Sequence, residues 1–558
     1  MLQRMKKIYT IFLSALLLVS CSSVELSPTD RYDKSYAFNS MENAELYLNY
    51  FYKEIYQFGQ FGSNALGGSN SNMSDGLTDI LKYGGIVAGT GDCNLIMTVD
   101  GQQRTTQNYF DSWTTCYGWI RRINEFLDGL EQSQGNFSAE EADRLRAEAL
   151  FFRAWSYFLI MRCHASVKDD MGVILYTSID EMNAEGKDHA RASVKDSWDL
   201  VEQDITFAVS HLPERASARG RLHRYAALAL KARSMLYAGR YSLAKEAVED
   251  IIENGGYGYE SDYDSIFASL DSKEAIWGYG FLSGVLTHLF DSKYSQPGDV
   301  CLKGNFGSGL AGPTQDFVDM FDNADGTPFD IADEERRFIT PENVGTRDPR
   351  LGKSVLYNRA EWKGRQLECY EGGVDQKYMP YGSVNSPGNT VTGYYMRKLL
   401  DPTNQDYLVN GSYQPWIEFR YAEMQLIYAE CCAMEGDFAG AWKAVADLRN
   451  VRFGKEVYTA PINSRESALD VILKERAVEL CFEGHRFWDL RRTGRAVQVL
   501  DGKKYSGVWW HKNGSGGFTS ELIVCEMGAR KYPERFDRFP IPQTEINNNI
   551  LARQNSDW

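Results

Sequence analysis

Apolar residues recur at three- and four-residue steps over several long stretches of the chain, which is the spacing of a helix with one buried face. In the clearest stretch, Leu145, Ala149 and Phe152 follow this spacing. The helices predicted from such patterns cover residues 41–58, 109–130, 139–163 and 194–212. We therefore expect a mostly α fold.

Two later segments look like copies of one helix–turn–helix unit. Ala232 lies seven positions before Gly239, Ala429 lies seven before Gly436, and each glycine has an aromatic residue two positions later. Small residues where helices cross and a glycine at the turn are typical of tetratricopeptide-type pairs, which stack on one another. Coincidence between two alanine-rich helices is the alternative.

Long irregular stretches separate these helical patterns. Residues 59–104, 255–416 and 502–541 are rich in Gly, Asn, Pro and Tyr and contain only short strand-like runs. A loop as long as 59–104 is functional or disordered, and loops held by rigid helices often carry binding residues. The expected fold is a scaffold of tetratricopeptide-type helix pairs with large irregular loop and short-strand insertions.

The beginning of the chain reads as a targeting segment. Three basic residues precede an apolar run at 8–19, which is too short for a spanning helix. The motif that ends at Cys21 resembles the lipobox of bacterial lipoproteins, in which that cysteine is lipidated. We predict a signal peptide at 1–20 and a lipidated tether at 21–40. An ordinary secretory leader that ends near a cysteine is the alternative.

Charge and aromatic content narrow the choice of partners. The chain has 60 Lys and Arg against 76 Asp and Glu, a formal net charge of −16, so a nucleic-acid partner is not expected. Aromatic residues make up 13% of the chain. A stock of rings this large can supply surface platforms as well as core.

The second half of the chain carries an ordered set of short motifs. They are Asp348-Pro349-Arg350, Gly393–Lys398, Arg420–Glu423, the run from Lys474 to Arg492, and Pro540-Ile541-Pro542. In this order they resemble the hallmark of SusD-like (RagB/SusD) outer-membrane lipoproteins. The resemblance extends over essentially the whole chain, from the lipobox to its end.

The resemblance implies a lipid-anchored outer-membrane protein that faces the cell exterior. Such a protein binds an oligosaccharide or polysaccharide and delivers it to a SusC-like TonB-dependent transporter, without catalysis and without a cofactor. It implies an N-terminal SusD-like helical part at 41–255 with a binding loop at 59–104. The C-terminal RagB/SusD part covers 256–558, with a hallmark helix at 466–484. The alternatives are a peptide-binding RagB-type protein, a surface glycoside hydrolase, and a passive lid without a ligand.

The hallmark helix contains carboxylates that could in principle form an acid–base pair. Glu475, Glu479 and Glu483 stand four residues apart and share one face of the helix. General-acid catalysis needs one carboxyl that stays protonated, whereas nearby arginines keep carboxylates ionised. The nearby arginines are Arg476, Arg486, Arg491 and Arg492. We expect structural ion pairs and no catalytic residue.

Metal and disulfide chemistry have little support. Asn323, Asp325 and Gly326 resemble part of a calcium-binding loop, but two of its carboxylate positions are missing, which leaves only an irregular calcium site open. The seven histidines are scattered without a metal-binding motif. A Cys93–Cys116 disulfide also stays open.

Carbohydrate binding needs flat rings against sugar C–H faces and planar polar groups for the hydroxyls. Three irregular stretches contain both kinds of residue, although ordinary packing is the alternative for any single ring. The candidate ligand-binding residues are Asn70, Asn72, Asp75, Asp79 and Tyr83 in the first stretch, Phe290, Asp291, Tyr294 and Gln296 in the second, and Tyr381 and Asn385 in the third. The tryptophans assigned to the core are Trp113, Trp155, Trp442 and Trp488.

Overall fold

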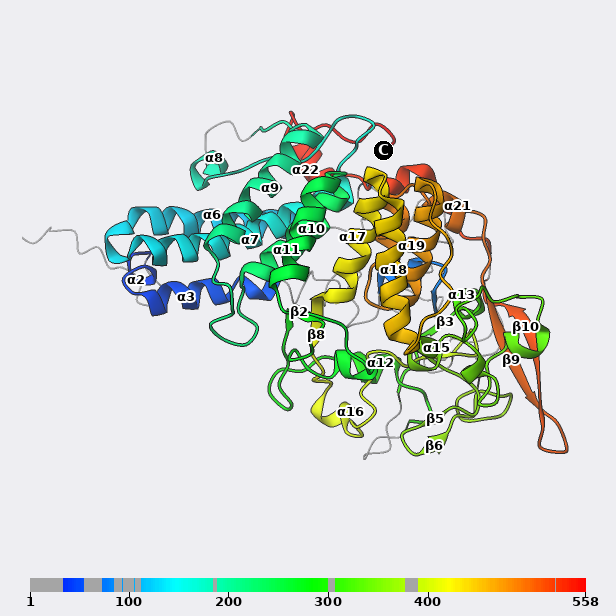
Figure 1. Ribbon diagram of the computed structural model, residues 1–558. Helices are drawn as coiled ribbons and strands as arrows, with labels where there is room; N and C mark the ends of the chain where they lie inside the picture. The colour runs from blue at the N-terminus through cyan, green and yellow to red at the C-terminus, as the bar shows by residue number, and fades with distance from the viewer. Residues whose placement is uncertain are drawn as a thin grey trace, which may run out of the picture.

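The protein is mostly helical, as predicted (Figure 1). The computed structural model describes residues 34–54, 73–84, 93, 105, 112–183, 188–299, 307–376, 390–526 and 528–558. The helices of the first half are α2 (Lys34–Ala37), α3 (Met41–Asn49), α6 (Trp113–Gln132), α7 (Ala139–His164), α8 (Ile179–Asn183), α9 (Val194–His211), α10 (Arg224–Tyr237) and α11 (Tyr241–Asn254). Those that follow are α12 (Phe290–Tyr294), α13 (Gln315–Met320), α14 (Glu334–Arg337), α15 (Pro349–Ser354), α16 (Tyr407–Asn410), α17 (Tyr421–Glu435), α18 (Phe438–Phe453), α19 (Arg465–Glu479), α20 (Arg486–Arg492), α21 (Ala496–Leu500) and α22 (Gln543–Asn548).

Strands are short and pair only in twos within the described residues. Each of the five ladders is antiparallel, and the pairs are β1–β3, β2–β8, β4–β7, β5–β6 and β9–β10. The strands are β1 (Leu81–Tyr83), β2 (Ala275–Tyr279), β3 (Ala311–Pro313), β4 (Val355–Leu356), β5 (Glu361–Trp362), β6 (Arg365–Gln366), β7 (Tyr395–Met396), β8 (Trp416–Arg420), β9 (Ser506–Lys512) and β10 (Phe518–Val524).

Two predicted helix starts are confirmed, and local capping explains both. The Ser138 side chain accepts a hydrogen bond from the backbone N–H of Glu141 at 3.2 Å, and the Glu141 carboxylate accepts one from the Ser138 N–H at 2.8 Å. Ser193 caps α9 with a single hydrogen bond, which its side chain accepts from the backbone N–H of Asp196 at 3.0 Å. These caps satisfy backbone donors that the first helical turn leaves without partners.

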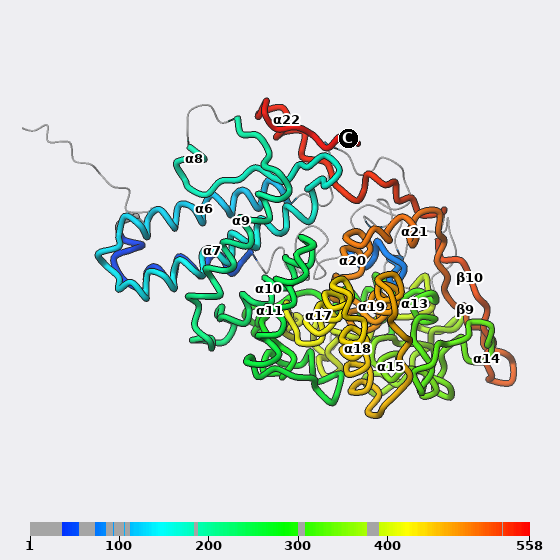
Figure 2. The backbone as a smooth tube through the Cα atoms, turned by 45° about the horizontal axis from the view of Figure 1, so that its top comes forward, coloured from blue at the N-terminus to red at the C-terminus, as the bar shows by residue number. Residues whose placement is uncertain are grey.

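The two predicted helix–turn–helix repeats are also confirmed. α10 packs against α11 and α17 against α18, and α11 packs against α17, so the two pairs form one stack (Figure 2). Gly239 and Gly436 make the turns with φ of 70° and 93°, values that favour glycine. Ala232 and Ala429 are fully buried where the helices cross.

Two predicted helices end earlier than expected. α3 ends at Asn49, residues 52–54 are helical again after a turn at 50–51, and residues 55–58 lie outside the described residues. α19 ends at Glu479 instead of residue 484. Phe482 and Gly484 have φ of 63° and 78°, and this left-handed backbone cannot continue a right-handed helix.

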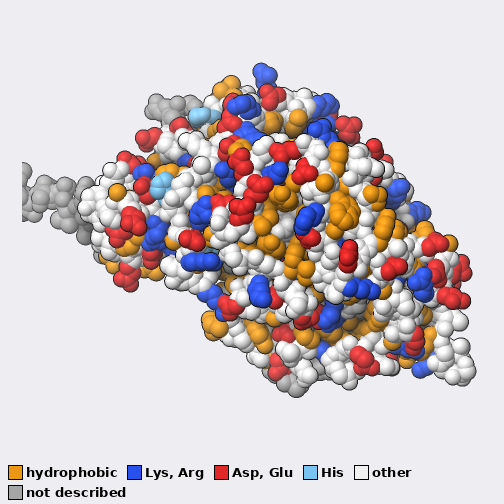
Figure 3. Space-filling model, in the orientation of Figure 1, with side chains coloured by type: hydrophobic (Ala, Val, Ile, Leu, Met, Phe, Trp, Pro, Cys, Tyr) orange, Lys and Arg blue, Asp and Glu red, His pale blue; other side chains and the backbone are white. Residues whose placement is uncertain are grey.

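The tryptophan assignment is right in three cases of four. Trp113, Trp155 and Trp488 are at most 4% exposed. Trp442 is 41% exposed on α18, because helical periodicity does not reveal which face a neighbour covers. Hydrophobic side chains gather on this side of the molecule over α17, α18 and α19 (Figure 3).

The described residues contain neither a Cys93–Cys116 disulfide nor a helix suited to span a membrane. Cys93 and Cys116 are both buried, lie in different core clusters and do not form a disulfide with each other. Within the same residues, none of the helices combines the length and the apolar character needed to cross a bilayer.

Candidate functional site

Three neighbouring pockets lie in the irregular part of the chain. We call them the ring hollow, the middle hollow and the basic hollow. The ring hollow has a volume of about 610 Å³, and its aromatic lining is Tyr52, Trp277, Tyr279, Phe281 and Tyr413. The middle hollow, of about 500 Å³, shares Ala268 and Tyr413 with the ring hollow. The basic hollow, of about 840 Å³, shares Lys353 and Arg397 with the middle hollow.

β2 and the residues just after it place the rings of the ring hollow. Tyr279 and Phe281 are half-buried, and their ring centroids lie 5.2 Å apart. Gly278, which lies between Trp277 and Tyr279 in the chain, lets β2 approach β8 closely. A Cβ at Gly278 would lie 2.2 Å from the carbonyl oxygen of Trp416, so no other residue fits without moving the ladder.

Polar groups around the ring hollow are fixed by their own hydrogen bonds. The Tyr52 hydroxyl donates to the Glu148 carboxylate at 2.8 Å. Arg221 pairs with the same carboxylate at 2.9 Å and donates to the side-chain oxygen of Asn49 at 2.6 Å. Arg219 is more accessible, because its side chain is 63% exposed. The hollow therefore combines open rings with planar hydrogen-bonding groups at its edge.

Aromatic rings and ion-paired groups line the middle hollow. The Trp362 ring lines it together with Tyr413. Asp264 accepts hydrogen bonds from Arg397 at 2.7 Å and from Lys353 at 2.6 Å. Burial alone would raise the pKa of Asp264, but these hydrogen bonds outweigh it and lower the pKa. The carboxylate is thus ionised at neutral pH.

Seven of the ligand-binding residues predicted from the sequence are buried and lie outside the three hollows. They are Asp75, Asp79, Tyr83, Phe290, Asp291, Tyr294 and Gln296. The Asp75 carboxylate accepts a hydrogen bond from the backbone N–H of Gly484 at 3.0 Å. The hydroxyls of Tyr83 and Tyr294 are hydrogen bonded to each other at 2.8 Å.

These seven side chains are buried against other parts of the chain in this structure, and their role in ligand binding stays a prediction. Polar residues in a glycine-rich stretch can reach inward as well as outward, and the composition of a loop does not distinguish the two cases. Four further candidates, Asn70, Asn72, Tyr381 and Asn385, lie outside the described residues and stay predictions.

The sequence held a signal for the ring hollow that composition alone missed. Trp277, Tyr279 and Phe281 occupy alternate positions. Alternation over a strand-like run places side chains on one face, so three rings at this spacing indicate a shared platform. Tyr413 and Trp362 have no comparable signal, because they come close to β2 only through the tertiary fold.

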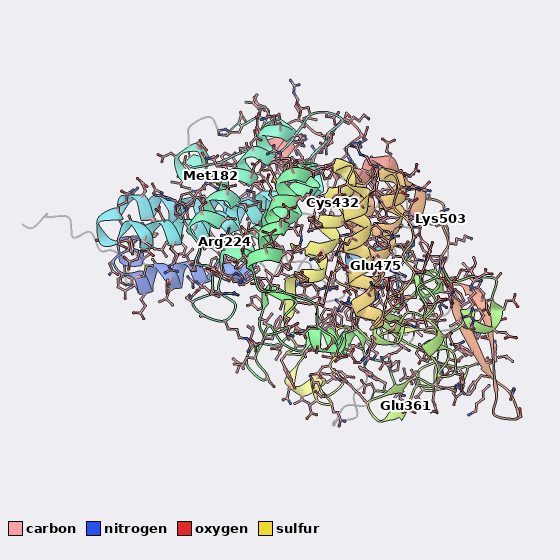
Figure 4. All side chains as sticks on the ribbon, in the orientation of Figure 1. Met182, Arg224, Glu361, Cys432, Glu475 and Lys503 are labelled. Atoms are coloured by element: carbon pink, nitrogen blue, oxygen red, sulfur yellow. The ribbon has the colours of Figure 1, made fainter. Side chains whose placement is uncertain are left out.

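The carboxylates of the hallmark helix are held in a buried ion network. Its members include Glu274, Glu475, Glu479, Glu483, Asp322, Asp348, Arg350, Lys398, Arg420, Arg449 and Arg452. Glu479 lies at its centre, 2.8 to 2.9 Å from Arg350, Arg420 and Arg452. Figure 4 places Glu475 within the helical stack.

The prediction of structural ion pairs is confirmed, but the predicted partners are wrong. Arg476 and Arg492 pair with Asp489, at 2.7 and 2.8 Å. Arg486 pairs with an aspartate from the N-terminal part of the chain, and Arg491 donates to backbone carbonyl oxygens. The true partners come from other elements, so neighbours in sequence were a poor guide.

The charges in this network lower the pKa of three of its four glutamates. Burial alone would raise the pKa of Glu479, but the charges of Arg452 and the other arginines outweigh it and hold the pKa well below its ordinary value. The pKa values of Glu475 and Glu483 are lowered too. These three carboxylates stay ionised at neutral pH, so none can act as the general acid of a glycoside hydrolase.

The segment proposed as an irregular calcium site uses its carboxylates in other ways. Asp322 pairs with Arg449 at 3.0 Å and with Lys474 at 2.6 Å. Asp325 accepts a hydrogen bond from the backbone N–H of Thr327 at 3.0 Å. Among the residues that the structure describes, His, Cys, Asp and Glu form no group of three or more arranged to hold a metal ion.

Family models match two parts of the chain. The model of the SusD family matches residues 273–558. A second model, described as starch-binding associating with outer membrane, matches residues 68–236.

Individual relatives and solved structures agree with these matches. SusD-like protein P38 of Formosa agariphila is 26% identical over 367 residues, which cover 63% of this chain and 67% of that protein. A SusD-like protein of Bacteroides ovatus is 23% identical, over 77% of this chain and 73% of its own length. The crystal structure of a SusD-like protein from Bacteroides fragilis aligns with a TM-score of 0.76 and 25% identity, covering 94% of this chain and 99% of the other. A second Bacteroides fragilis structure, of a SusD-like carbohydrate binding protein, aligns with a TM-score of 0.73 and 24% identity, covering 92% and 99%.

Proposed function

This chain belongs to the SusD family, and we propose that it binds a glycan at the outer membrane and delivers it to a SusC-like TonB-dependent transporter. The family model described as starch-binding associating with outer membrane supports this proposal. So does the Bacteroides fragilis protein of similar fold, which is described as carbohydrate binding.

The observation that carries the proposal is the ring hollow. Half-buried rings at Tyr279, Phe281 and Tyr413 can stack on the C–H faces of sugars with little loss of side-chain entropy. Arg219 and Asn49, at the edge of the hollow, can bind hydroxyl groups. A volume of about 610 Å³ lies in the range typical of ligand sites.

Membrane attachment in this proposal depends on Cys21. Lipidation of this cysteine would hold the protein at the outer membrane, facing the exterior, without a spanning helix. A single acyl chain gives only marginal binding, whereas more than one gives stable anchoring. The binding face is then free to meet polysaccharide outside the cell.

The proposed function does not include catalysis. The three hallmark glutamates are ionised and buried in the ion network. Capture without turnover predicts that an oligosaccharide is retained and recovered intact. Chromatography of the mixture after long incubation tests this, because a shortened product would favour the glycoside hydrolase.

Binding itself is tested with the mature protein and two matched variants. Affinity electrophoresis across a polysaccharide panel identifies a ligand, and calorimetry measures the dissociation constant. Tyr413→Ala removes the ring shared by the ring and middle hollows, and we expect about tenfold weaker binding, as for a buried contact at an interface centre.

The control is Tyr458→Ala, which removes a tyrosine that is 45% exposed outside the hollows. Unchanged affinity is expected for this variant. Equal effects of the two substitutions, or retention of oligopeptides with no polysaccharide bound, would contradict the proposal.

A further inference from the structure

The basic hollow carries a local charge opposite to that of the whole chain. Its lining holds five cationic side chains and one carboxylate, that of Glu361, whereas the chain has a formal net charge of −16. The cations are Arg347, Lys353, Arg359, Arg397 and Lys455. Glu361 lies on β5 at the edge of the molecule (Figure 4). Because nearby charges dominate the potential in a cleft, this hollow attracts anions.

Three of the cations have carboxylate partners that lie outside the lining of the basic hollow. Arg359 pairs with Glu342, whose side chain is 65% exposed. Lys353 and Arg397 both pair with Asp264, which lines the middle hollow. Ion pairs this exposed contribute at most about 1 kcal/mol, so an anionic ligand can compete for these cations.

Neither of the other two cations forms an ion pair within the part of the chain that the structure describes. Arg347 donates instead to the backbone carbonyl oxygens of Val318 and Phe321, at 3.0 and 2.6 Å. Burial lowers the pKa of Arg347 to about 10. Lys455 is exposed and follows α18 directly. The exposed positive charge available to a ligand is therefore that of Lys455, because Arg347 is only 1% exposed.

The remaining lining suits a sugar ring. Val344, Tyr357 and Phe453 give the hollow apolar walls, and Gln366 adds a planar amide. Its volume of about 840 Å³ is large enough for a saccharide residue with a charged substituent.

The position of the basic hollow connects it with the rings. Lys353 and Arg397 line both the basic and the middle hollow, and Tyr413 lines both the middle and the ring hollow. A polymer that stacks on the rings can therefore extend across the middle hollow to the cations.

We propose that the basic hollow binds an anionic substituent of the captured glycan, either the carboxylate of a uronic acid or a sulfate ester. The cargo is then an acidic polysaccharide. This inference rests on the proposed function, since it names the class of ligand of the same surface.

Matched pairs of oligosaccharides test the charge requirement. One pair is oligogalacturonate and its fully methyl-esterified form, and the other is a sulfated oligogalactan and its desulfated form. Calorimetry at low salt should show about tenfold tighter binding of the charged member in at least one pair, as expected for a charge-assisted hydrogen bond. The preference should disappear near 1 M salt, where the Debye length is about 3 Å.

A double variant tests the site. Arg359→Gln with Lys455→Gln should remove the preference for the charged member and leave binding of the neutral member unchanged. Lys195→Gln is the control, because this lysine is 77% exposed on α9. Thermal unfolding of each variant checks that it is folded.

Two results would overturn the inference. One is equal affinity for both members of both pairs, and the other is a charge preference that survives in the double variant. If neutral saccharides still bind and Tyr413→Ala weakens them, the proposed function stands and only the inference fails. If no saccharide binds at all, the proposed function fails with it.

Discussion

Glu479→Gln perturbs the centre of the buried ion network without changing the size of the side chain. Glu479 is fully buried and lies within 2.9 Å of Arg350, Arg420 and Arg452. The substitution removes the negative charge and leaves the three guanidinium groups in place. Destabilisation should follow, because a buried charge that loses its partner keeps its desolvation penalty.

The size of the effect follows from what the arginines retain. Breaking a buried ion pair costs about 3–5 kcal/mol. Arg350 keeps Asp348 and Glu475, Arg420 keeps Glu274 and Glu483, and Arg452 keeps Glu274. We therefore expect the lower end of this range, about 3 kcal/mol. For 558 residues that unfold together, this corresponds to roughly 3 °C in the unfolding midpoint.

Urea unfolding followed by circular dichroism measures this difference. Glu435→Gln on α17 is the control, because the ion pair of Glu435 with Lys245 is partly exposed and should contribute less than about 1 kcal/mol. The glycan dissociation constant should not change in either variant. A loss below about 1 kcal/mol for Glu479→Gln, or a loss of binding without a loss of stability, would refute the reasoning.

Four further predictions concern the effect of pH at two carboxyl groups, a turn and the lipid anchor. The pKa of Glu479 is lowered in the folded state, so the penalty of Glu479→Gln should shrink as the pH falls below about 4.5, measured as the difference in urea midpoints. Burial raises the pKa of Asp75 to about 7, so between about pH 4 and 7 this carboxyl ionises in the unfolded chain but stays protonated in the fold. Stability of the parent therefore falls as the pH rises over that window, and Asp75→Asn should gain stability relative to the parent. Gly436→Ala should lower the unfolding free energy by about 1 kcal/mol in the same assay, because φ at this turn is 93° although a Cβ would have open space. Cys21→Ser should abolish incorporation of a labelled fatty acid, and continued labelling would contradict a lipid anchor at this residue.

Local signals predicted the helical scaffold well. The starts of α7 and α9 follow from serine caps, and the turns at Gly239 and Gly436 follow from small residues at fixed spacing. Each of these signals lies within a few residues of the cap or turn that it determines, so it can be recognised in the sequence.

Long-range pairing was not predictable in the same way. Glu475 binds Arg350, which lies 125 positions away, although four arginines stand much closer in the sequence. The choice is made by the tertiary fold, which brings α15 against the hallmark helix. Likewise, Asp75 and Tyr83 belong to a polar, glycine-rich stretch yet face inward, because their partners Gly484 and Tyr294 come from distant segments.

The rings of the candidate site were predictable from the sequence only in part. Trp277, Tyr279 and Phe281 alternate along a strand-like run, so their common face could be read from the sequence. The basic hollow could not, because its cations are spread from residue 347 to residue 455 and carry no shared pattern.

The pairing of β2 with β8 has a consequence for how ligands come and go. β8 continues without a break into α17, so the strand pair that carries Trp277 and Tyr279 is joined to the helical stack. Because this strand pair is already ordered, little backbone freedom would be lost there if a ligand bound. The residence time of a ligand would then depend on its contacts, and repeated binding and release would need no rearrangement of the backbone.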